Sequence, residues 1–445
     1  MPVWPIRPIL GKKKHMKKVV IFFSCWYAFI CHAQTNDSAS RLAASYFKET
    51  ETASRGQHIW KEQVYGPMMF VDPVSRQTYA NMPDSAGILK PDGPIFSGVL
   101  PNDVLIANTA IHWAGKLWSV MLWPLPTDRD ERVNLMEHES FHRIQDEMGL
   151  PGRSPTADDL STMYGRIYFL LELQALKAAL SKPVNKRAFD LTNALKFREK
   201  RRELFPATFP NERILEMNEG LAEYTGVILG RPKDSILQHL YYQVDTAGNR
   251  KSFIRSSAYI TGPVYGYLLF QKYPRWTLKV DSNSDFPSLI AKYYHITPPR
   301  RQANEPVAAL EKKYNGESII RSEKLKEEKR LQIANDYTDL FNHKPVLTIT
   351  LVKVLVEFNP NTLFDLGEYG TVYPTADVKD TWGELTVNST GMLMKDWKVI
   401  TLPAGEALTE NGRIVEGPGW KIALKDNWRL VKVDGTHYRL VDGNR

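Results

Sequence analysis

Residues 127–149, TDRDERVNLMEHESFHRIQDEMG, decide the architecture of the first half of the chain. Thr127, with Asp130 three residues later, is typical of the start of a helix. Gly149 and Pro151 predict its end, because glycine commonly terminates a helix and proline cannot continue one. We therefore expect one well-bounded helix over about 128–148.

This helix contains the pattern His138-Glu139-Ser140-Phe141-His142. Residues four apart share a helical face, so both imidazoles can reach one metal ion, and zinc suits neutral nitrogen ligands. Glu139, next to the first histidine, can take a proton from a water molecule, which is the general-base role in metal-assisted hydrolysis. The alternative is a chance pattern, which recurs about once in a hundred chains of this size.

A catalytic zinc site needs a third protein ligand and one open position. A metzincin would place a histidine at position 148, where this chain has Met148. A second helix, expected to open at Pro210-Asn211 and to stop at Gly230, carries Glu219 with Glu223 one turn later. It therefore supplies candidate acidic ligands.

Here the sequence resembles the gluzincins, above all zinc aminopeptidases of the aminopeptidase-N type. Their third ligand is the Glu of an Asn-Glu-Gly-aromatic-Ala motif, which Asn218 to Ala222 matches with Leu221 in the aromatic position. The resemblance implies one zinc ion held by His138, His142 and Glu219. It also implies that Glu223 orients a histidine ligand, the alternative being an exposed helix acid.

The family also carries a downstream Tyr-x-Lys-Gly segment whose phenol donates to the oxyanion, and Tyr259-Ile260-Thr261-Gly262 is similar to it, with Thr261 in place of lysine. The resemblance implies a catalytic Tyr259, against a core or surface tyrosine as the alternative. Gln145 is similar to a glutamine of enhancin-like mucin proteases, and a polar position on the helix surface explains it equally well. The segment that reads a free amino terminus in aminopeptidases is absent.

Residues 107–126 predict a β-hairpin around Ala114-Gly115, ended by Pro124 and Pro126. By the resemblance, the run 116–123 is the edge strand that pairs with an extended substrate. The tryptophans of this hairpin are expected in the core more often than in a cleft, and His112 is expected to be simply hydrogen-bonded.

Composition narrows the class of function. The six basic residues of the first 33 account for most of the net charge of +8, and the rest of the chain has 52 basic against 50 acidic residues. We therefore expect no nucleic-acid partner. Both cysteines, Cys25 and Cys31, precede the predicted cleavage site at Ala33, which excludes disulfides and thiolate chemistry from the mature chain.

The chain divides into five predicted parts. They are a signal peptide over 1–33 with a possible true start at Met16, an irregular covering segment over 34–106, a gluzincin-like catalytic domain over 107–301 with a helical insertion over 152–210, a charged helical connector over 302–342, and a β-rich domain over 343–445. The apolar run 19–31 is short for a membrane span, so an anchor is the weaker interpretation.

The sequence thus predicts an α+β protein, with a mainly helical, thermolysin-like zincin domain followed by an all-β domain. Its expected function is exported, zinc-dependent peptide hydrolysis in the periplasm or outside the cell, acting on a peptide or protein substrate. Two rivals remain: a zinc-containing surface or periplasmic binding protein without catalysis, and a zinc hydrolase of a non-peptide bond.

Overall fold

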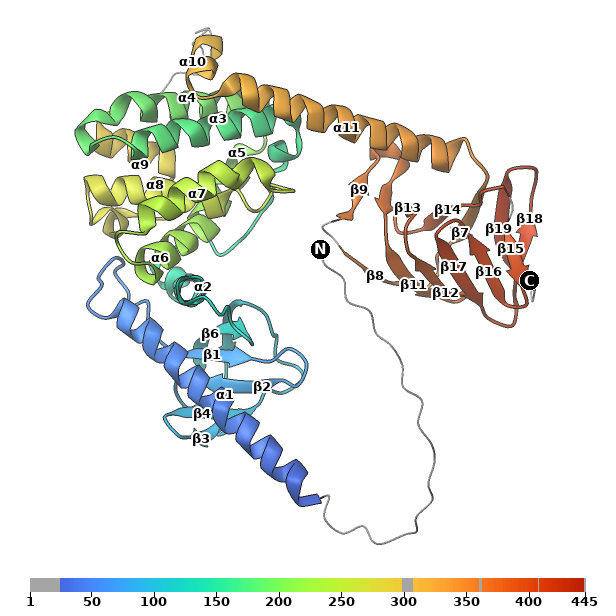
Figure 1. The fold of residues 1–445 in the computed structure, drawn as a ribbon, viewed down its shortest axis with the longest axis horizontal. Helices are drawn as coiled ribbons and strands as arrows, with labels where there is room; N and C mark the ends of the chain where they lie inside the picture. Colours follow the sequence, from blue (N-terminus) through green and yellow to red (C-terminus); the bar gives the residue numbers. More distant parts are fainter. Residues whose placement is uncertain (1–24, 298–306, 360–361, 407, 444–445) are drawn as a thin grey trace, which may run out of the picture. The chain divides into compact units, whose positions relative to one another are not determined.

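A computed structural model describes residues 25–297, 307–359, 362–406 and 408–443 (Figure 1). The chain forms two compact units that divide between Ile319 and Ile320. No helix in these described ranges has the length and apolar character needed to cross a bilayer. The predicted signal peptide lies largely outside the described residues, and helix α1 (Cys25–Ser54) runs through the predicted cleavage position at Ala33.

The first unit begins with α1 and a six-stranded sheet. The strands are β1 (Met68–Val71), β2 (Gln77–Ala80), β3 (Lys90–Asp92), β4 (Ile95–Val99), β5 (Thr109–Trp113) and β6 (Lys116–Leu122). Their order is β3-β4-β2-β1-β6-β5, with β1 and β6 parallel and the other neighbours antiparallel.

The prediction of an irregular segment over 34–106 is wrong. Ala43, Tyr46 and Phe47 repeat at helical spacing and pack on the sheet against Phe70, and α1 crosses one face of the sheet in Figure 1. Strand β1 is buried along its whole length, so it shows no polar alternation. The many proline and glycine residues of this region mark short turns between short strands.

The predicted hairpin is confirmed as β5 and β6. Ala114 and Gly115 have φ angles of 43° and 78°, as a two-residue turn of the I′ type requires. The prediction that residues 116–123 form the edge strand is wrong, however. Strand β6 lies between β1 and β5, and β5 is the edge strand. The cause is the parallel pairing of β6 with β1, from the region that was taken to be irregular.

The rest of the first unit is helical. It comprises α2 (Arg129–Gln145), α3 (Met163–Leu180), α4 (Ala188–Leu204), α5 (Phe209–Leu215), the π-helical turn η4 (Glu216–Gly220), α6 (Leu221–Gly230), α7 (Ile236–Thr246), α8 (Ala258–Lys272), α9 (Phe286–Tyr294) and α10 (Val307–Lys313). Helix α2 is capped by Asp128 rather than by the predicted Thr127, because the Asp128 carboxylate accepts from the backbone N–H of Glu131 at 2.9 Å.

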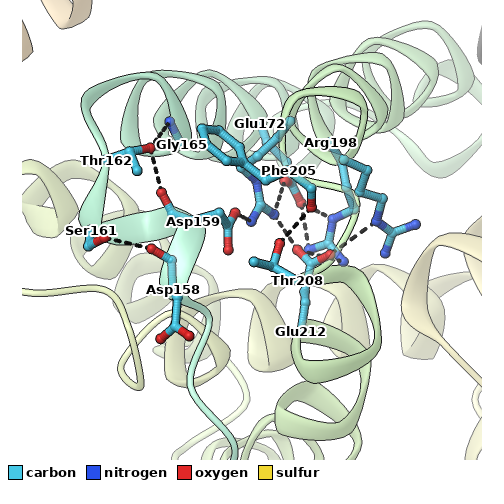
Figure 2. A network of polar contacts seen from close by, with 12 residues as sticks. Asp158, Asp159, Ser161, Thr162, Gly165, Glu172, Arg198, Phe205, Thr208 and Glu212 are labelled. Atoms are coloured by element: carbon cyan, nitrogen blue, oxygen red, sulfur yellow. Dashed lines mark hydrogen bonds and ion pairs between the residues drawn. The ribbon is translucent and has the colours of Figure 1, made fainter.

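Helices α3 and α4 lie within 152–210, the range predicted as a helical insertion, and a buried ion network joins them to α5, as Figure 2 shows for Glu172, Arg198 and Glu212. Arg198 of α4 donates to Glu172 of α3 at 2.7 Å and binds both carboxylate oxygens of Glu216 at 2.7 and 2.8 Å. Arg201 pairs with Asp159 at 2.7 Å and with Glu212. The insertion is therefore fixed to the turn that leads into α6.

Glycines let three helices approach closely. A Cβ on Gly226 of α6 would come within 2.5 Å of the Asn134 carbonyl oxygen of α2, and one on Gly262 of α8 would collide with the backbone of Gly220. These contacts draw α2, η4 and α8 together, because only glycine leaves room for a neighbouring backbone. Their side chains converge in the candidate site described below.

Helix α11 (Gly316–Asn342) crosses the division between the units, within the predicted connector 302–342. The second unit then has two sheets, with order β18-β19-β7-β14-β13-β10-β9 in one and β15-β16-β17-β12-β11-β8 in the other. Both sheets contribute to a single apolar cluster that includes Trp382 and Trp420. The α+β class and the strand-rich C-terminal region are confirmed.

The strands of the second unit are β7 (Val346–Thr350), β8 (Leu355–Phe358), β9 (Phe364–Asp365), β10 (Thr371–Tyr373), β11 (Ala376–Asp380), β12 (Gly383–Val387), β13 (Met392–Lys395), β14 (Val399–Pro403), β15 (Thr409–Asn411), β16 (Ile414–Gly417), β17 (Trp420–Leu424), β18 (Trp428–Lys432) and β19 (His437–Asp442). Strands β11, β12 and β17 alternate strictly between buried and exposed residues, as expected for a sheet with one face in a core.

Candidate metal centre

Three potential ligand atoms converge from two helical segments. His138 and His142 lie one turn apart on α2, with their Nε2 atoms 3.2 Å apart. The Glu219 Oε2 atom lies 3.4 Å from the first nitrogen and 3.6 Å from the second. Among the described residues, this is the one group of three or more His, Cys, Asp or Glu ligands close enough to hold a metal ion.

These separations fit a tetrahedral zinc ion. Bonds of about 2.0–2.1 Å to nitrogen and oxygen, at tetrahedral angles, place the ligand atoms about 3.4 Å from one another. The distances of 3.2, 3.4 and 3.6 Å bracket this value. Three ligands also leave the fourth position free for water or substrate.

A hydrogen bond orients His138. Its Nδ1 atom donates to Glu223 Oε2 at 2.9 Å, and the other Glu223 oxygen accepts from Asn134 at 3.1 Å. Because a carboxylate can only accept, the proton is on Nδ1 and the Nε2 lone pair faces the candidate site. Burial lowers the pKa of His138, but the hydrogen bonds to Glu219 and Glu223 outweigh burial and raise it to about 10. The surroundings therefore favour a cation at Nε2, which is a proton in the metal-free site and which a metal ion would replace.

His142 is oriented in the same way by Gln145, whose Oε1 accepts from Nδ1 at 2.8 Å. Of the two explanations of Gln145, the surface position is wrong, since only 2% of this residue is exposed. Its amide nitrogen donates to Asn218 at 2.6 Å and to the Pro151 carbonyl oxygen, which identifies Oε1 as the acceptor. When both Nε2 atoms are deprotonated, two histidine lone pairs face each other, and a cation between them would relieve their repulsion.

Glu219 lies on the π-helical turn η4, a rare geometry that often marks functional sites. Its Oε2 atom accepts from the Tyr259 hydroxyl at 2.6 Å, and Oε1 accepts from Ser154. Burial raises its pKa, but hydrogen bonds with His138 and His142 outweigh this and hold the pKa far below its ordinary value. Glu219 is thus ionised at neutral pH.

Tyr259 is brought here by the packing of Gly262 on Gly220, one helical turn away on α8. Its ring stacks on His138 with 5.4 Å between centroids and 10° between planes. Its hydroxyl points at the Glu219 oxygen that faces both histidines. The sequence-based placement of Tyr259 beside the predicted ligands is therefore matched by the geometry.

Glu139 borders the same cavity, and one of its buried oxygens, Oε2, has no hydrogen-bond partner. Burial raises the pKa of this carboxyl, although His138 and His142 counteract part of the effect. A carboxylate with a raised pKa and a free oxygen is a stronger base than an exposed carboxylate and can accept a proton from water. Such an orphaned buried acceptor is unusual in a folded protein and fits a water molecule or substrate beside the ligands.

The cavity has a volume of about 350 Å³ and is lined mainly by polar side chains. The edge strand β5 contributes one wall through Thr109, Ala110 and the exposed His112, and the segment with Gly152 and Ser154 contributes to the lining. The hairpin tryptophans pack elsewhere: Trp118 is fully buried, and Trp113 and Trp123 pack against the cores on either face of the sheet.

The structure brings together all six predicted site residues, namely His138, Glu139, His142, Glu219, Glu223 and Tyr259. Sequence reasoning missed the partners Asn134, Ser154 and Gln145, and treated Asn218 only as part of a motif. Gln145 and Asn218 had a signal, because they lie close to ligands in the chain. Ser154 had none, since it precedes Glu219 by 65 residues.

Searches of protein-family models, of curated proteins and of solved structures found no match to this chain.

Proposed function

We propose that the chain is an exported, single-zinc metallopeptidase that hydrolyses peptide bonds. The observation that carries this proposal is the convergence of two histidine lone pairs and one carboxylate oxygen within 3.2–3.6 Å, beside the unpartnered oxygen of Glu139. His138, His142 and Glu219 hold the metal. A zinc ion bound there acidifies water and polarises a carbonyl group.

Glu139 is the general base in this proposal. Its free Oε2 takes a proton from the attacking water, and the same oxygen passes the proton to the amine that leaves. The raised pKa of Glu139 suits both steps, because it makes the carboxylate a stronger base toward water, while the protonated carboxyl group remains a stronger acid than the ammonium group of the leaving amine. The Tyr259 hydroxyl, which donates to Glu219 Oε2 in the free site, turns to donate a hydrogen bond to the developing oxyanion.

The edge strand β5 supports a peptide as the substrate. In an antiparallel hairpin with a two-residue turn, the pair that flanks the turn, Trp113 and Lys116, is hydrogen-bonded, and the pairs then alternate. The backbone groups of His112 and Ala110 therefore face away from β6, and both residues line the cavity. An extended peptide can add to this edge as a further strand, which places a carbonyl group near Glu139.

The test is Glu139→Gln in the full chain, assayed with a peptide library and with the zinc-to-protein ratio measured by elemental mass spectrometry. We expect a ratio near one in both proteins and a loss of cleavage of about 10²–10⁴-fold in the variant, the usual scale for a general base. Cleavage at the wild-type rate by the variant would refute the role of Glu139. A wild type that holds zinc but cleaves no peptide would favour a binding protein or a hydrolase of another bond.

A further inference from the structure

A continuous chain of hydrogen bonds joins two of the candidate metal ligands. His142 Nδ1 donates to Gln145 at 2.8 Å, and the Gln145 amide donates to Asn218 Oδ1 at 2.6 Å. The Asn218 amide then donates to the Ser154 hydroxyl at 2.8 Å, and this hydroxyl donates to Glu219 Oε1. Every side chain in this series is therefore hydrogen-bonded to the next one.

Ser154 comes from the start of the segment 152–210, which adds α3 and α4 to the first unit. The backbone around it is held in place at both sides. The Pro151 carbonyl oxygen accepts from Gln145, and the Ala157 N–H donates to the Ile254 carbonyl oxygen at 2.9 Å. Ser154 itself is exposed and lines the cavity. Its hydroxyl is thus a fixed feature of the cavity wall.

The two oxygens of Glu219 consequently face different surroundings. Oε1 accepts from Ser154 and from the Asn218 amide, the latter at 3.1 Å. Oε2 faces both histidine Nε2 atoms and the Tyr259 hydroxyl. The contacts to Oε1 prevent the carboxylate from turning both oxygens toward the metal position.

We propose that Ser154 is a positioning residue that fixes Glu219 as a one-oxygen metal ligand and, through Asn218 and Gln145, couples it to His142. The segment 152–210 is then part of the metal centre and more than a wall of the cavity. Hydrogen-bond partners of this kind orient a ligand and typically change metal affinity by about 10–100-fold when they are removed.

This inference rests on the proposed function only in its use of a bound divalent metal, so the test measures metal and not peptide cleavage. Zinc dissociation constants are measured by competition with a chelating dye for the full-length wild type and for Ser154→Ala. We expect the variant to bind zinc about 10–100-fold more weakly. Ser154→Thr keeps the hydroxyl at an exposed position and is expected to bind within about threefold of the wild type.

Ser161→Ala is the matched control. It removes an exposed hydroxyl from the same segment, and this hydroxyl bonds to the Asp158 carbonyl oxygen, outside the cavity lining. Zinc affinity should not change in this variant. Unfolding curves of the metal-free proteins should coincide for the wild type and both alanine variants, so that a general loss of structure is separated from a loss of ligand orientation.

A second measurement reads the coordination directly. With Co²⁺ in place of zinc, a four-coordinate site gives strong visible absorption, and this absorption weakens when a ligand supplies a second oxygen. We expect weaker bands in Ser154→Ala and bands of wild-type strength in Ser154→Thr and Ser161→Ala. Equal affinity and equal spectra in Ser154→Ala and the wild type would overturn this inference alone, whereas a wild type that binds no zinc would overturn both this inference and the proposed function.

Discussion

Two clusters of acidic side chains, one buried and one half-buried, meet at the turn η4 and differ in the partners of their carboxylates. Glu216, at the start of this turn, belongs to a network with Arg198, where both of its oxygens bind a guanidinium group. Glu219, three residues later, faces two histidines, and no lysine or arginine in the described part of the chain forms an ion pair with it. The same short segment thus contributes one acid to a cluster that contains guanidinium groups and another acid to a cluster without them.

The difference lies in the groups that can balance the negative charge of each cluster. In the first cluster, Glu172, Glu212 and Glu216 outweigh the cost of burial and hold the pKa of Arg198 well above its usual range, so the positive charge is internal. In the second, Glu219 and Glu223 bond only to neutral donors or to imidazoles. In the proposed function a divalent metal ion completes that second cluster, because buried charges are stable only when they are paired or coordinated.

Glu137 shows a third outcome on the same helix as the histidines. It is fully buried, one oxygen accepts from Ser54, and the other has no partner. Burial raises its pKa to about 8, so this carboxyl carries a proton at neutral pH. A guanidinium group, a metal ion and a proton are thus three ways to neutralise a buried acid, and the following experiments separate them.

The largest expected effect is on the ionic cluster. Arg198→Met leaves the carboxylates of Glu172 and Glu216 buried without their cation, which should lower the free energy of unfolding by about 3–5 kcal/mol. Denaturant unfolding of the zinc-loaded protein measures this loss of stability. Lys200→Met is the matched control on α4, since its exposed ion pair with Glu203 is expected to contribute less than about 1 kcal/mol. A stable Arg198→Met protein would show that Arg198 does not hold this cluster.

The next effect concerns the cluster around Glu219. Free zinc at a hundred times its dissociation constant should stabilise the wild type by about 2.7 kcal/mol, and a chelator should remove this gain. Glu219→Gln should abolish the response, because it replaces a charged ligand by a neutral amide. Glu147→Gln, an exposed acid just beyond α2, should retain it. Thermal unfolding with and without zinc distinguishes these outcomes, and an unchanged response in Glu219→Gln would remove this residue from the ligand set.

A smaller effect should follow from the partner of His138. Glu223→Leu removes the acceptor that fixes the Nδ1 proton, so zinc affinity should fall about 10–100-fold. Glu223→Gln retains an acceptor oxygen and should lose less. Dye competition measures both constants. Equal affinities in all three proteins would mean that the histidine needs no partner to present its lone pair.

The remaining effect concerns Glu137 and depends on pH. Because its pKa is raised from 4.5 when unfolded to about 8 when folded, unfolding releases a proton between these two pH values. Its contribution to stability is therefore full below about pH 4.5 and is lost progressively as the pH rises toward 8. Glu137→Gln mimics the protonated form, so its stability relative to its parent should rise by about 1.4 kcal/mol per pH unit between pH 5 and pH 8, with little gain at pH 5 itself. Unfolding is measured in the Glu219→Gln background so that zinc does not contribute, and an equal gain at both pH values would contradict the buried proton.

The predictable part of the site is the part that is local in the chain. His138 and His142 share a face of α2 because they are four residues apart, and Glu219 and Glu223 share a face for the same reason. The hairpin was equally local, since Ala114-Gly115 forms the turn between adjacent strands. Helix periodicity and turn chemistry act over a few residues, so one sequence suffices to recognise them.

The missed part depends on contacts between distant segments. Nothing near β6 indicates that β1 pairs beside it and leaves β5 at the edge, because that pairing joins residues about fifty positions apart. Gln145 looked like a surface residue for the same reason. Its burial depends on Asn218 and Pro151, and a helical pattern alone does not show which polar residue a neighbouring helix will cover.

The sequence by itself therefore determined the α+β class, the strand-rich C-terminal region and the residue types that can hold and use a metal ion. The tertiary structure alone decided that these residues meet, through glycine contacts such as Gly220 with Gly262, and that Ser154 completes the surroundings of Glu219. The physical reason is the separation along the chain over which each kind of interaction acts. Helix and turn preferences act between near neighbours, whereas close packing and buried hydrogen bonds select partners from the whole folded chain.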